Sequence, residues 1–249
     1  MTSPHHVAVT VPHIELPFPS RIHPLVEAAV EHCNERVRLF GMIPNDQYAR
    51  PFEADRFGEL AARAFADAAP SELMLMADWM GWYFAFDDAL DTTAVGRNVA
   101  RTSAIIDEVV SVLSTRPPAP PPDDALPGTR ALADLWARSW AVLPGSSWCS
   151  RFADYMIRFV LAYRRQAEIN SMGEAMDAEV FAYSHRPHSS GAVATAILIE
   201  PAMRASLTDR IVAIKQVGEL YDVSGRLIAW LNDLHSAGNE VPSATCATS

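Results

Sequence analysis

The chain contains 249 residues, of which 49% are hydrophobic and 20% are charged, and its formal net charge is −10. This composition is typical of a globular chain that can bury a core within one domain or at most two. An acidic chain is a poor nucleic-acid binder, because affinity for nucleic acid comes mainly from lysine and arginine side chains that neutralise phosphates. A small phosphate ligand could still bind if metal ions supplied the positive charge. No apolar run approaches the ~20 residues that a membrane-spanning helix requires.

The cysteines and the N-terminus indicate the cellular compartment. Cys33, Cys149 and Cys246 are few, odd in number and far apart, without a CxxC pair, which is typical of reduced thiols in a cytosolic protein. The first residues lack the basic start and the apolar core of a signal peptide. We therefore expect a cytoplasmic protein that binds no nucleic acid and spans no membrane.

The N-terminal part predicts an extended arm followed by helices. Residues 1–20 contain four prolines and are expected to be extended. From residue 21 onward, apolar residues recur at the three-and-four spacing of a helix, and Gly41 supplies a stop signal. Residues 53–70 repeat this pattern and predict one further helix, which Pro70 ends.

The next helix is expected to be central and buried. Ser71 is a good N-cap for residues 71–91, which are apolar around most of the helix circumference. The prolines of residues 115–128 forbid helix and sheet, so this stretch is expected to be an extended connector. Its doubled aspartate, Asp123 and Asp124, is interpreted as a solvated turn without function.

Helical patterns continue to the C-terminal region. Helical spacing resumes at about Arg130 and again at about Ser150, and residues 206–209 have the spacing of a capping box that opens one long helix toward Ser236. Strand signals are weak, because there is no sustained alternation and no Asn-Gly hairpin. We predict an all-α fold with a single domain over residues 21–240 and an irregular tail over residues 241–249.

Aromatic and acidic residues meet in the stretch WYFAFDDALD, residues 82–91. Asp87 and Asp91 are one helical turn apart and share a face, whereas Asp88 points about 100° away. An exposed acidic helix end is one interpretation, but apolar residues run without interruption up to Asp87. Carboxylates beside buried surface need partners, and hard oxygen ligands on a rigid helix suit Mg²⁺.

A second polar stripe lies in the stretch WLNDLHSAGNE. Asn232, Ser236 and Glu240 are spaced by four and then four, which places an amide oxygen, a hydroxyl and a carboxylate along one stripe of one helix. Such a pattern alone is common on a solvated face. Together with the first cluster in an all-α chain, it predicts a binding site for a hard cation.

The two clusters resemble the metal-binding motifs of bacterial class I terpene cyclases. DDALD matches the aspartate-rich motif DDxxD, and NDLHSAGNE matches the second motif, (N/D)DxxSxxxE, at every specified position. In that family an arginine 46 residues before the Asn of the second motif senses the diphosphate, and here this position is Arg186. The resemblance covers nearly the whole chain, from about Glu15 to Glu240.

The resemblance implies a class I terpenoid synthase helical bundle with three bound Mg²⁺ ions. It implies the following metal ligands on two facing helices: Asp87, Asp91, Asn232, Ser236 and Glu240. Arg186 would donate charged hydrogen bonds to the diphosphate of an isoprenoid substrate, which Asn232 would also contact. Asp87 and Arg186 would thus carry the ionisation of the allylic C–O bond.

The aromatic residues before Asp87 would form an apolar wall for the resulting carbocation. Ring faces stabilise a passing cation by ~0.5–2 kcal/mol per well-placed ring, and Tyr83 and Phe84 lie one turn before Asp87. Ordinary core packing remains an equal interpretation for both residues. We expect Trp79 and Trp230 to be core residues.

The resemblance also implies the reaction. The expected activity is Mg²⁺-dependent cyclisation of an isoprenoid diphosphate, with farnesyl diphosphate as the expected substrate and geranyl or geranylgeranyl diphosphate left open. Related chain-elongating prenyltransferases carry a second Asp-rich motif, whereas this chain has the Asn-Ser-Glu version, which favours cyclisation.

The chain departs from the family at its end. Glu240 lies nine residues before the C-terminus, whereas relatives continue through several more helices. We therefore expect a bundle that lacks its last helices and exposes apolar surface on its final helix, which favours aggregation or partnering, a homodimer included. The alternative function is a catalytically impaired or inactive terpene-synthase-like α-domain that acts as a binding or interaction module.

Overall fold

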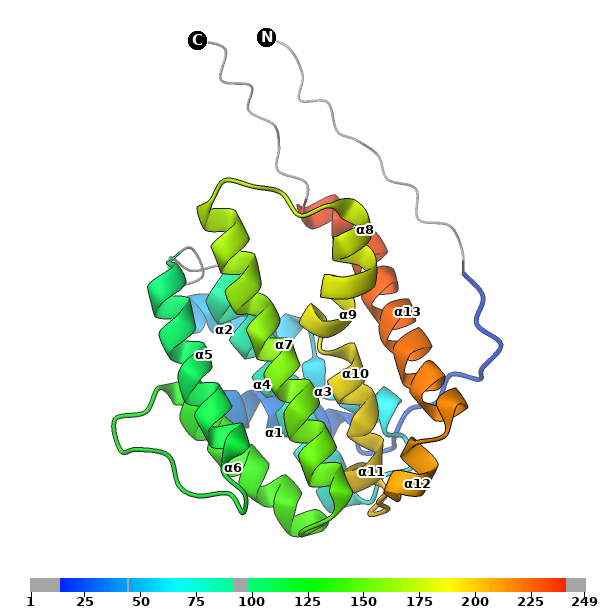
Figure 1. The fold of residues 1–249 in the computed structure, drawn as a ribbon. Coiled ribbons are helices and arrows are strands. Elements are labelled where there is room, and N and C mark those ends of the chain that lie inside the picture. Colours follow the sequence, from blue (N-terminus) through cyan, green and yellow to red (C-terminus); the bar gives the residue numbers. More distant parts are fainter. Residues whose placement is uncertain (1–13, 44, 92–97, 241–249) are drawn as a thin grey trace, which may run out of the picture.

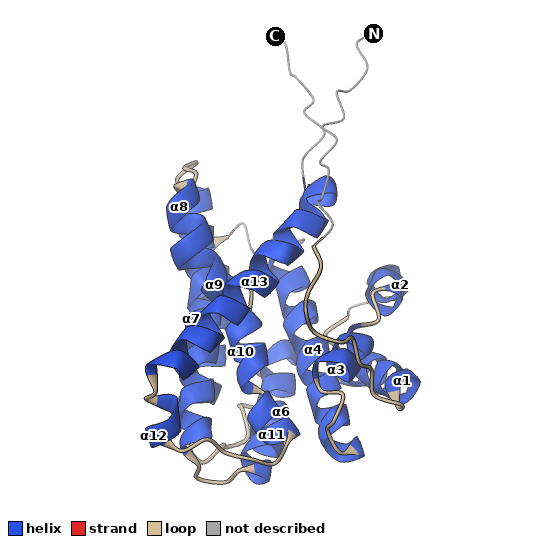
Figure 2. Ribbon diagram, turned by 90° about the vertical axis from the view of Figure 1, so that its right-hand side faces the viewer, coloured by secondary structure: helices blue, strands red, loops and turns tan. Residues whose placement is uncertain are grey.

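The computed structural model of the chain describes residues 14–43, 45–91 and 98–240, and every regular element in these ranges is a helix (Figure 1; Figure 2). The all-α prediction is therefore confirmed. The side chains of Asp91 and of residues 237–240 lie outside the description. The bounds are α1 (Val26–Leu39), α2 (Asp46–Ala54), α3 (Phe57–Ala64), α4 (Pro70–Asp91), α5 (Val99–Ser114), α6 (Pro127–Val142), α7 (Ser147–Ser171), α8 (Ala178–Val180), the π-helix η1 (Phe181–His185), α9 (Arg186–Ser189), α10 (Ala192–Ile197), α11 (Ile199–Ala202), α12 (Asp209–Val212) and α13 (Lys215–Glu240).

Helix α4 is the central helix of the N-terminal half. It packs against α1, α3 and α6. Its Leu73, Met76 and Trp79 side chains are fully buried, as expected for a helix that is apolar around most of its circumference. Gly81 permits the close approach of α1, because a Cβ at this position would lie 2.9 Å from Cys33 Sγ. The prediction of a buried central helix is confirmed.

Four helices from residue 99 onward form a row along one side of the molecule. Figure 1 shows α5, α7, α10 and α13 from left to right, and neighbouring members of this row pack on one another. Between α10 and α13 the approach depends on Gly225, where a Cβ would lie 2.4 Å from Val193 Cγ2. This contact brings the long final helix against the rest of the bundle.

Aromatic rings join α4 to α7, where Phe152 of α7 meets Trp79 of α4 edge-on and stacks on Trp148 of its own helix. The ring of Phe152 lies 4.9 Å from the ring of Trp79 and 4.9 Å from that of Trp148. Both buried indole N–H groups find acceptors: Trp79 Nε1 donates to Ser139 Oγ at 2.9 Å, and Trp148 Nε1 donates to Ile197 O at 3.0 Å. Burial of these large rings, with their polar atoms satisfied, makes a large contribution to the stability of the bundle.

A carboxylate is buried where α1, α4 and α6 meet. Asp78 Oδ2 lies 2.8 Å from Arg138 Nη2 and 3.6 Å from Arg36 Nε, and Asp78 Oδ1 lies 3.0 Å from His32 Nε2. A buried charge requires such partners, because removal from water is costly. Asp78 therefore links three helices through charge rather than through apolar packing.

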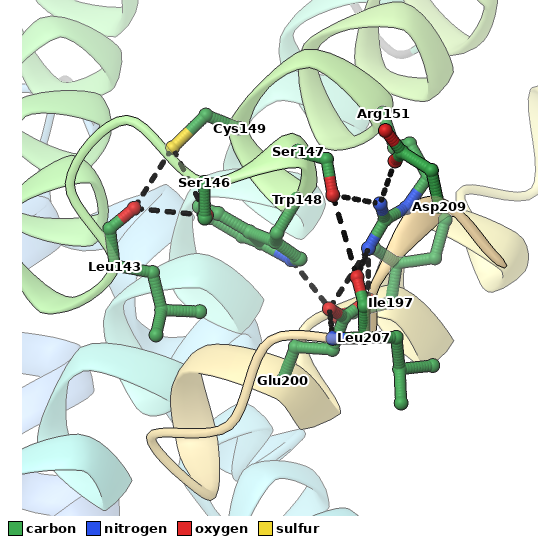
Figure 3. A network of polar contacts seen from close by, with 10 residues as sticks. All are labelled: Leu143, Ser146, Ser147, Trp148, Cys149, Arg151, Ile197, Glu200, Leu207 and Asp209. Carbon is green, nitrogen blue, oxygen red and sulfur yellow. Dashed lines mark hydrogen bonds and ion pairs between the residues drawn. The ribbon is translucent and has the colours of Figure 1, made fainter. Parts of the chain in front are cut away.

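Arg151 of α7 binds both α11 and the segment that follows α11 (Figure 3). Its Nη2 donates to both carboxylate oxygens of Glu200 at 2.9 Å and to Leu207 O at 3.2 Å. Its Nη1 donates to Ser147 Oγ at 2.8 Å, and the Glu200 carboxylate also accepts from the Leu207 backbone N–H at 2.6 Å. These contacts hold the connection between α11 and α12 against the N-terminal turn of α7.

Predicted helix boundaries are wrong at three places. Pro70 is the first residue of α4 rather than the end of the preceding helix, and Ser71 is therefore not the N-cap of α4. The helix predicted over residues 53–70 is interrupted at Arg56, whose φ of 53° is left-handed, and α3 starts anew at Phe57. The break lets Gly58 press against α1, where a Cβ would lie 2.3 Å from Ala29 O. The long final helix begins at Lys215, because α12 ends at Val212 and the chain turns before α13.

The proline-rich connector lies outside the helices, except that α6 already begins at Pro127, within the range predicted for the connector. Residues 115–126 connect α5 to α6 without a helix, and Asp123 and Asp124 are exposed there. The predicted arm lies outside the described residues up to residue 13, residues 14–20 form no helix or strand, and the tail over 241–249 also lies outside the description. None of the helices in the described ranges has the length and apolar character needed to cross a membrane.

Candidate functional site

Asp87 lies near the C-terminal end of α4, on the side that faces α7. The Tyr163 hydroxyl of α7 donates a hydrogen bond to Asp87 Oδ1. The Tyr163 ring is held edge-on by two neighbours, Phe86 at 5.8 Å and Phe159 at 5.3 Å between ring centroids. A tyrosine held in this way fixes the direction of the Asp87 carboxylate. Sequence reasoning missed Tyr163, because helical spacing does not show which residue of α7 meets which residue of α4.

The two predicted wall residues point to different neighbours. Tyr83 is buried on the Asp87 side of α4, and its hydroxyl donates to Met156 Sδ of α7 at 3.0 Å. Burial raises the pKa of Tyr83 well above its usual value, so the phenol stays neutral. Phe84 stacks on Phe57 of α3, with ring centroids 3.9 Å apart, and is thus turned away from α7.

The other two aspartates of the first motif differ in position. Asp88 is exposed as a residue, but part of its carboxyl group is shielded from water. This shielding is the main cause that raises the pKa of Asp88, and the nearby carboxylates of Asp87 and Asp55 raise it further. Its separation from the face of Asp87 agrees with the predicted rotation along the helix. Asp91 is the last residue of α4, and its side chain lies outside the described part of the chain.

Arg186 is presented by an irregular helical segment. Asp177 caps α8 by accepting hydrogen bonds from two backbone N–H groups, and the helix then widens into η1 before α9 starts at Arg186. Wide helical turns of this kind are frequent at functional sites. The segment ends at Gly191, whose φ of 66° is left-handed and where a Cβ would lie 3.2 Å from the Phe159 ring.

The guanidinium of Arg186 reaches the second motif on α13. Arg186 Nε donates to Asp233 Oδ1 at 2.7 Å, and Arg186 Nη2 donates to Asn232 Oδ1 at 2.9 Å. Next to these contacts, Trp230 Nε1 donates to Ala182 O at 3.1 Å. The structure therefore brings together two residues, Arg186 and Asn232, that the motif spacing had paired across 46 positions.

Two residues near this contact differ from expectation. Asp233 was not singled out from the sequence, although it is the second residue of the NDLHSAGNE motif and carries the shortest contact of Arg186, at 2.5 Å. Trp230 was expected in the core, and that prediction is wrong, because its ring is exposed and packs edge-on against Tyr183 at 5.4 Å.

Ser236 lies one helical turn beyond Asn232 on α13. Its Oγ is buried and has no hydrogen-bond partner within the described part of the chain. Such an orphaned polar atom is costly unless a ligand satisfies it. Glu240, the last residue of α13, has its side chain outside the description.

The donor chemistry fits a hard divalent cation. Asp87, Asn232 and Ser236 offer a carboxylate, an amide oxygen and a hydroxyl, which are the ligand types that Mg²⁺ prefers. The Asn232 oxygen has two lone pairs, so it can accept from Arg186 and still bind a metal ion. The described residues contain no group of three or more His, Cys, Asp or Glu that could hold a metal, and the side chains of Asp91 and Glu240 lie outside that description.

The motifs and the fold have counterparts in known proteins. Residues 78–247 match the family described as terpene synthase family 2, C-terminal metal binding. The chain is 28% identical over 242 residues to pristinol synthase of Streptomyces pristinaespiralis. The aligned residues make up 96% of this chain and 64% of that protein. The chain is also 28% identical over 227 residues to (-)-beta-caryophyllene synthase of Saccharothrix espanaensis. That alignment includes 90% of this chain and 62% of that protein.

Solved structures show the same fold. Wild-type cucumene synthase matches with a TM-score of 0.75 and 28% identity, over 90% of this chain and 73% of that chain. Hedycaryol synthase in complex with nerolidol matches with a TM-score of 0.75 over 92% of this chain and 73% of that chain. At 21% identity, this second likeness concerns the fold alone. The chain spans less than two thirds of the length of pristinol synthase and of (-)-beta-caryophyllene synthase.

Proposed function

We propose a metal-dependent cyclase activity for this chain, which belongs to the terpene synthase family with a C-terminal metal-binding region. The substrate is an isoprenoid diphosphate, and the products are a cyclic terpene and inorganic diphosphate. The printed names of two relatives, (-)-beta-caryophyllene synthase and (+)-T-muurolol synthase, include farnesyl diphosphate cyclisation. We extend that substrate to this chain.

One observation carries the proposal. Arg186 extends from α9 onto Asn232 and Asp233 of α13, so that a guanidinium lies beside the proposed metal ligands. A guanidinium is well suited to grip a diphosphate, because its planar donors match phosphate oxygens. A diphosphate bound here would meet the metal ions and the arginine at the same time.

Each residue of the site has a proposed role. Asp87 binds Mg²⁺ from α4, in a direction that Tyr163 fixes, and Asp91 supports it. Asn232, Ser236 and Glu240 are the proposed ligands on α13. Three bound Mg²⁺ ions would act as Lewis acids that draw negative charge onto the diphosphate. Arg186 takes part of the charge that develops on the leaving diphosphate as the allylic C–O bond breaks.

The carbocation is protected by the aromatic side of α4. Tyr83 lies on the same side of this helix as Asp87 and meets Phe159 of α7 edge-on at 5.5 Å. Its neutral phenol offers no phenolate that could trap the cation. We assign the wall to Tyr83 and Phe159 and assign no such role to Phe84, which packs on α3.

Product analysis tests the proposal. The chain is incubated with farnesyl diphosphate and Mg²⁺, and the organic extract is analysed by gas chromatography and mass spectrometry. A cyclic terpene is expected, and it should disappear with EDTA and in Asp87→Asn or Ser236→Ala. Asp123→Asn, in the exposed connector, is the matched control and should retain full activity. Product that persists in Asp87→Asn would rule out this metal site.

A second candidate function rests on the exposed face of α13. Leu220, Val223 and Ile228 are exposed there, as predicted for the final helix. Large apolar surface of this kind marks interaction sites. A binding module would take up Mg²⁺ and diphosphate yet release no product from farnesyl, geranyl or geranylgeranyl diphosphate. We also propose that the chain forms a homodimer and lies in the cytoplasm. Light scattering measures the molar mass and thereby tests the dimer.

A further inference from the structure

A cavity of about 380 Å³ lies between α7 and the segment of η1 and α9. We name it the α7–α9 groove, and its lining includes Arg158, Leu161, Arg165, Val180, His185 and His188. The lining positions of α7 recur at helical spacing and share one face. The residues of α7 that meet α4, Phe159 and Tyr163, lie on a different face of this helix, rotated by about 100° or more from both arginines. The groove is thus separate from the candidate site.

Two arginines give the groove a positive charge in an acidic chain. Arg158 and Arg165 are seven residues apart on α7, about 10 Å along the helix axis. Neither forms an ion pair with a carboxylate in the described part of the chain, whereas Arg151 and Arg164 on the same helix do. The guanidinium of Arg158 rests over the Tyr155 ring at 5.4 Å. Both charges therefore remain available to a ligand.

The two histidines add neutral hydrogen-bonding groups between these charges. Burial, followed by the nearby Arg165, lowers the pKa of His185. Burial, followed by Arg158, lowers the pKa of His188, against the opposing effect of a carboxylate on α13. At neutral pH each ring is uncharged and offers one N–H donor and one acceptor.

Carboxylates near the groove do not cancel its charge. Asp154 lies one turn before Arg158 on α7, but it contacts Arg116 at 3.3 Å. Asp222 of α13 acts on His188, beside the end of the groove that Arg158 lines. One carboxylate beside the groove thus stands against two guanidinium groups, and the groove keeps a net positive charge.

We propose that the α7–α9 groove binds a small diphosphate-type anion without a metal ion. Guanidinium groups bind phosphate oxygens through paired, charge-assisted hydrogen bonds, and two of them flank the groove. Leu161 and Val180 provide apolar surface for a short substituent on the anion. This site goes beyond the proposed cyclase activity, because it shares no residue with the metal ligands and requires no Mg²⁺.

Calorimetric titration of the full chain in EDTA tests this site. Inorganic diphosphate, orthophosphate and dimethylallyl diphosphate are the ligands, at low salt. We expect one site for both diphosphates, weaker binding of orthophosphate, and a loss of roughly tenfold or more in Arg158→Gln/Arg165→Gln. The matched control is Arg50→Gln/Arg101→Gln, which removes the same charge from two exposed arginines elsewhere and should retain the affinity.

Several outcomes would overturn the assignment. These are absence of diphosphate binding in the unmodified chain, unchanged affinity in Arg158→Gln/Arg165→Gln, or an equal loss in the control pair. Binding of dimethylallyl diphosphate without binding of inorganic diphosphate would also contradict it, because the guanidinium groups would then not be the recognition element. Asp87→Asn should leave diphosphate binding in EDTA unchanged. Diphosphate binding in EDTA thus tests the groove, and product formation with Mg²⁺ tests the cyclase proposal.

Discussion

Replacement of Glu200 by alanine tests whether charge holds α11 and α12 against α7. The Glu200 and Arg151 side chains are only 3% and 16% exposed. Removing one partner of a buried ion pair costs ~3–5 kcal/mol, and the Leu207 N–H loses its acceptor as well. Arg151 keeps the hydroxyl of Ser147 and the exposed carboxylate of Asp209. We therefore expect the lower end of that range, a loss of about 3 kcal/mol in the free energy of unfolding.

Urea denaturation followed by circular dichroism measures this loss. The matched control is Asp67→Ala, which removes a comparable double contact with Arg21, but in a pair whose side chains are 60% and 55% exposed. Water screens an exposed pair, so the control should lose much less stability than Glu200→Ala. Suppose that the two variants lose the same free energy of unfolding, with equal slopes of that free energy against urea concentration. In that case burial does not strengthen the Arg151 contacts, and the reasoning is refuted.

Three further changes have defined outcomes. Trp148→Ala removes a fully buried ring and should lower the free energy of unfolding by about 3–5 kcal/mol, as measured in urea. Burial raises the pKa of Cys33 to about 12, so its thiol stays protonated at pH 8 and iodoacetamide should label it only after unfolding, as read by peptide mass spectrometry. Tyr163→Phe removes the hydrogen bond to Asp87 and should weaken Mn²⁺ binding about tenfold, as read by electron paramagnetic resonance; unchanged affinity would remove Tyr163 from the site.

The sequence predicts the helical core well because burial follows periodicity. Residues 71–91 are apolar around most of the helix, and such a helix has no solvent face to present, so it must lie inside. Breaks are harder to predict. The left-handed turn at Arg56 depends on a close packing of Gly58 on α1, which involves residues far apart in the chain. Local propensity contains no information on that contact.

The candidate site could be predicted in part because its motifs resemble those of class I terpene cyclases, and this resemblance supplies the spacing between Arg186 and the second motif. Motif spacing pairs Arg186 with Asn232, and the structure places the two in contact. The partners that orient these groups, Tyr163 and Asp233, come from contacts between helices, which periodicity does not specify. The widened turn η1 that precedes Arg186 has no signal in the sequence pattern either.

Divalent cations shared between α4 and α13 are the central claim, and a double-mutant cycle on Mn²⁺ binding tests it most directly. Binding is measured by electron paramagnetic resonance in the presence of inorganic diphosphate, for the unmodified chain, Asp87→Asn, Ser236→Ala and the double variant. Residues that hold the same ion cluster act as a unit, so the double variant should bind about as weakly as the worse single variant. Losses that simply add, or binding that ignores Asp87→Asn, would contradict a shared site.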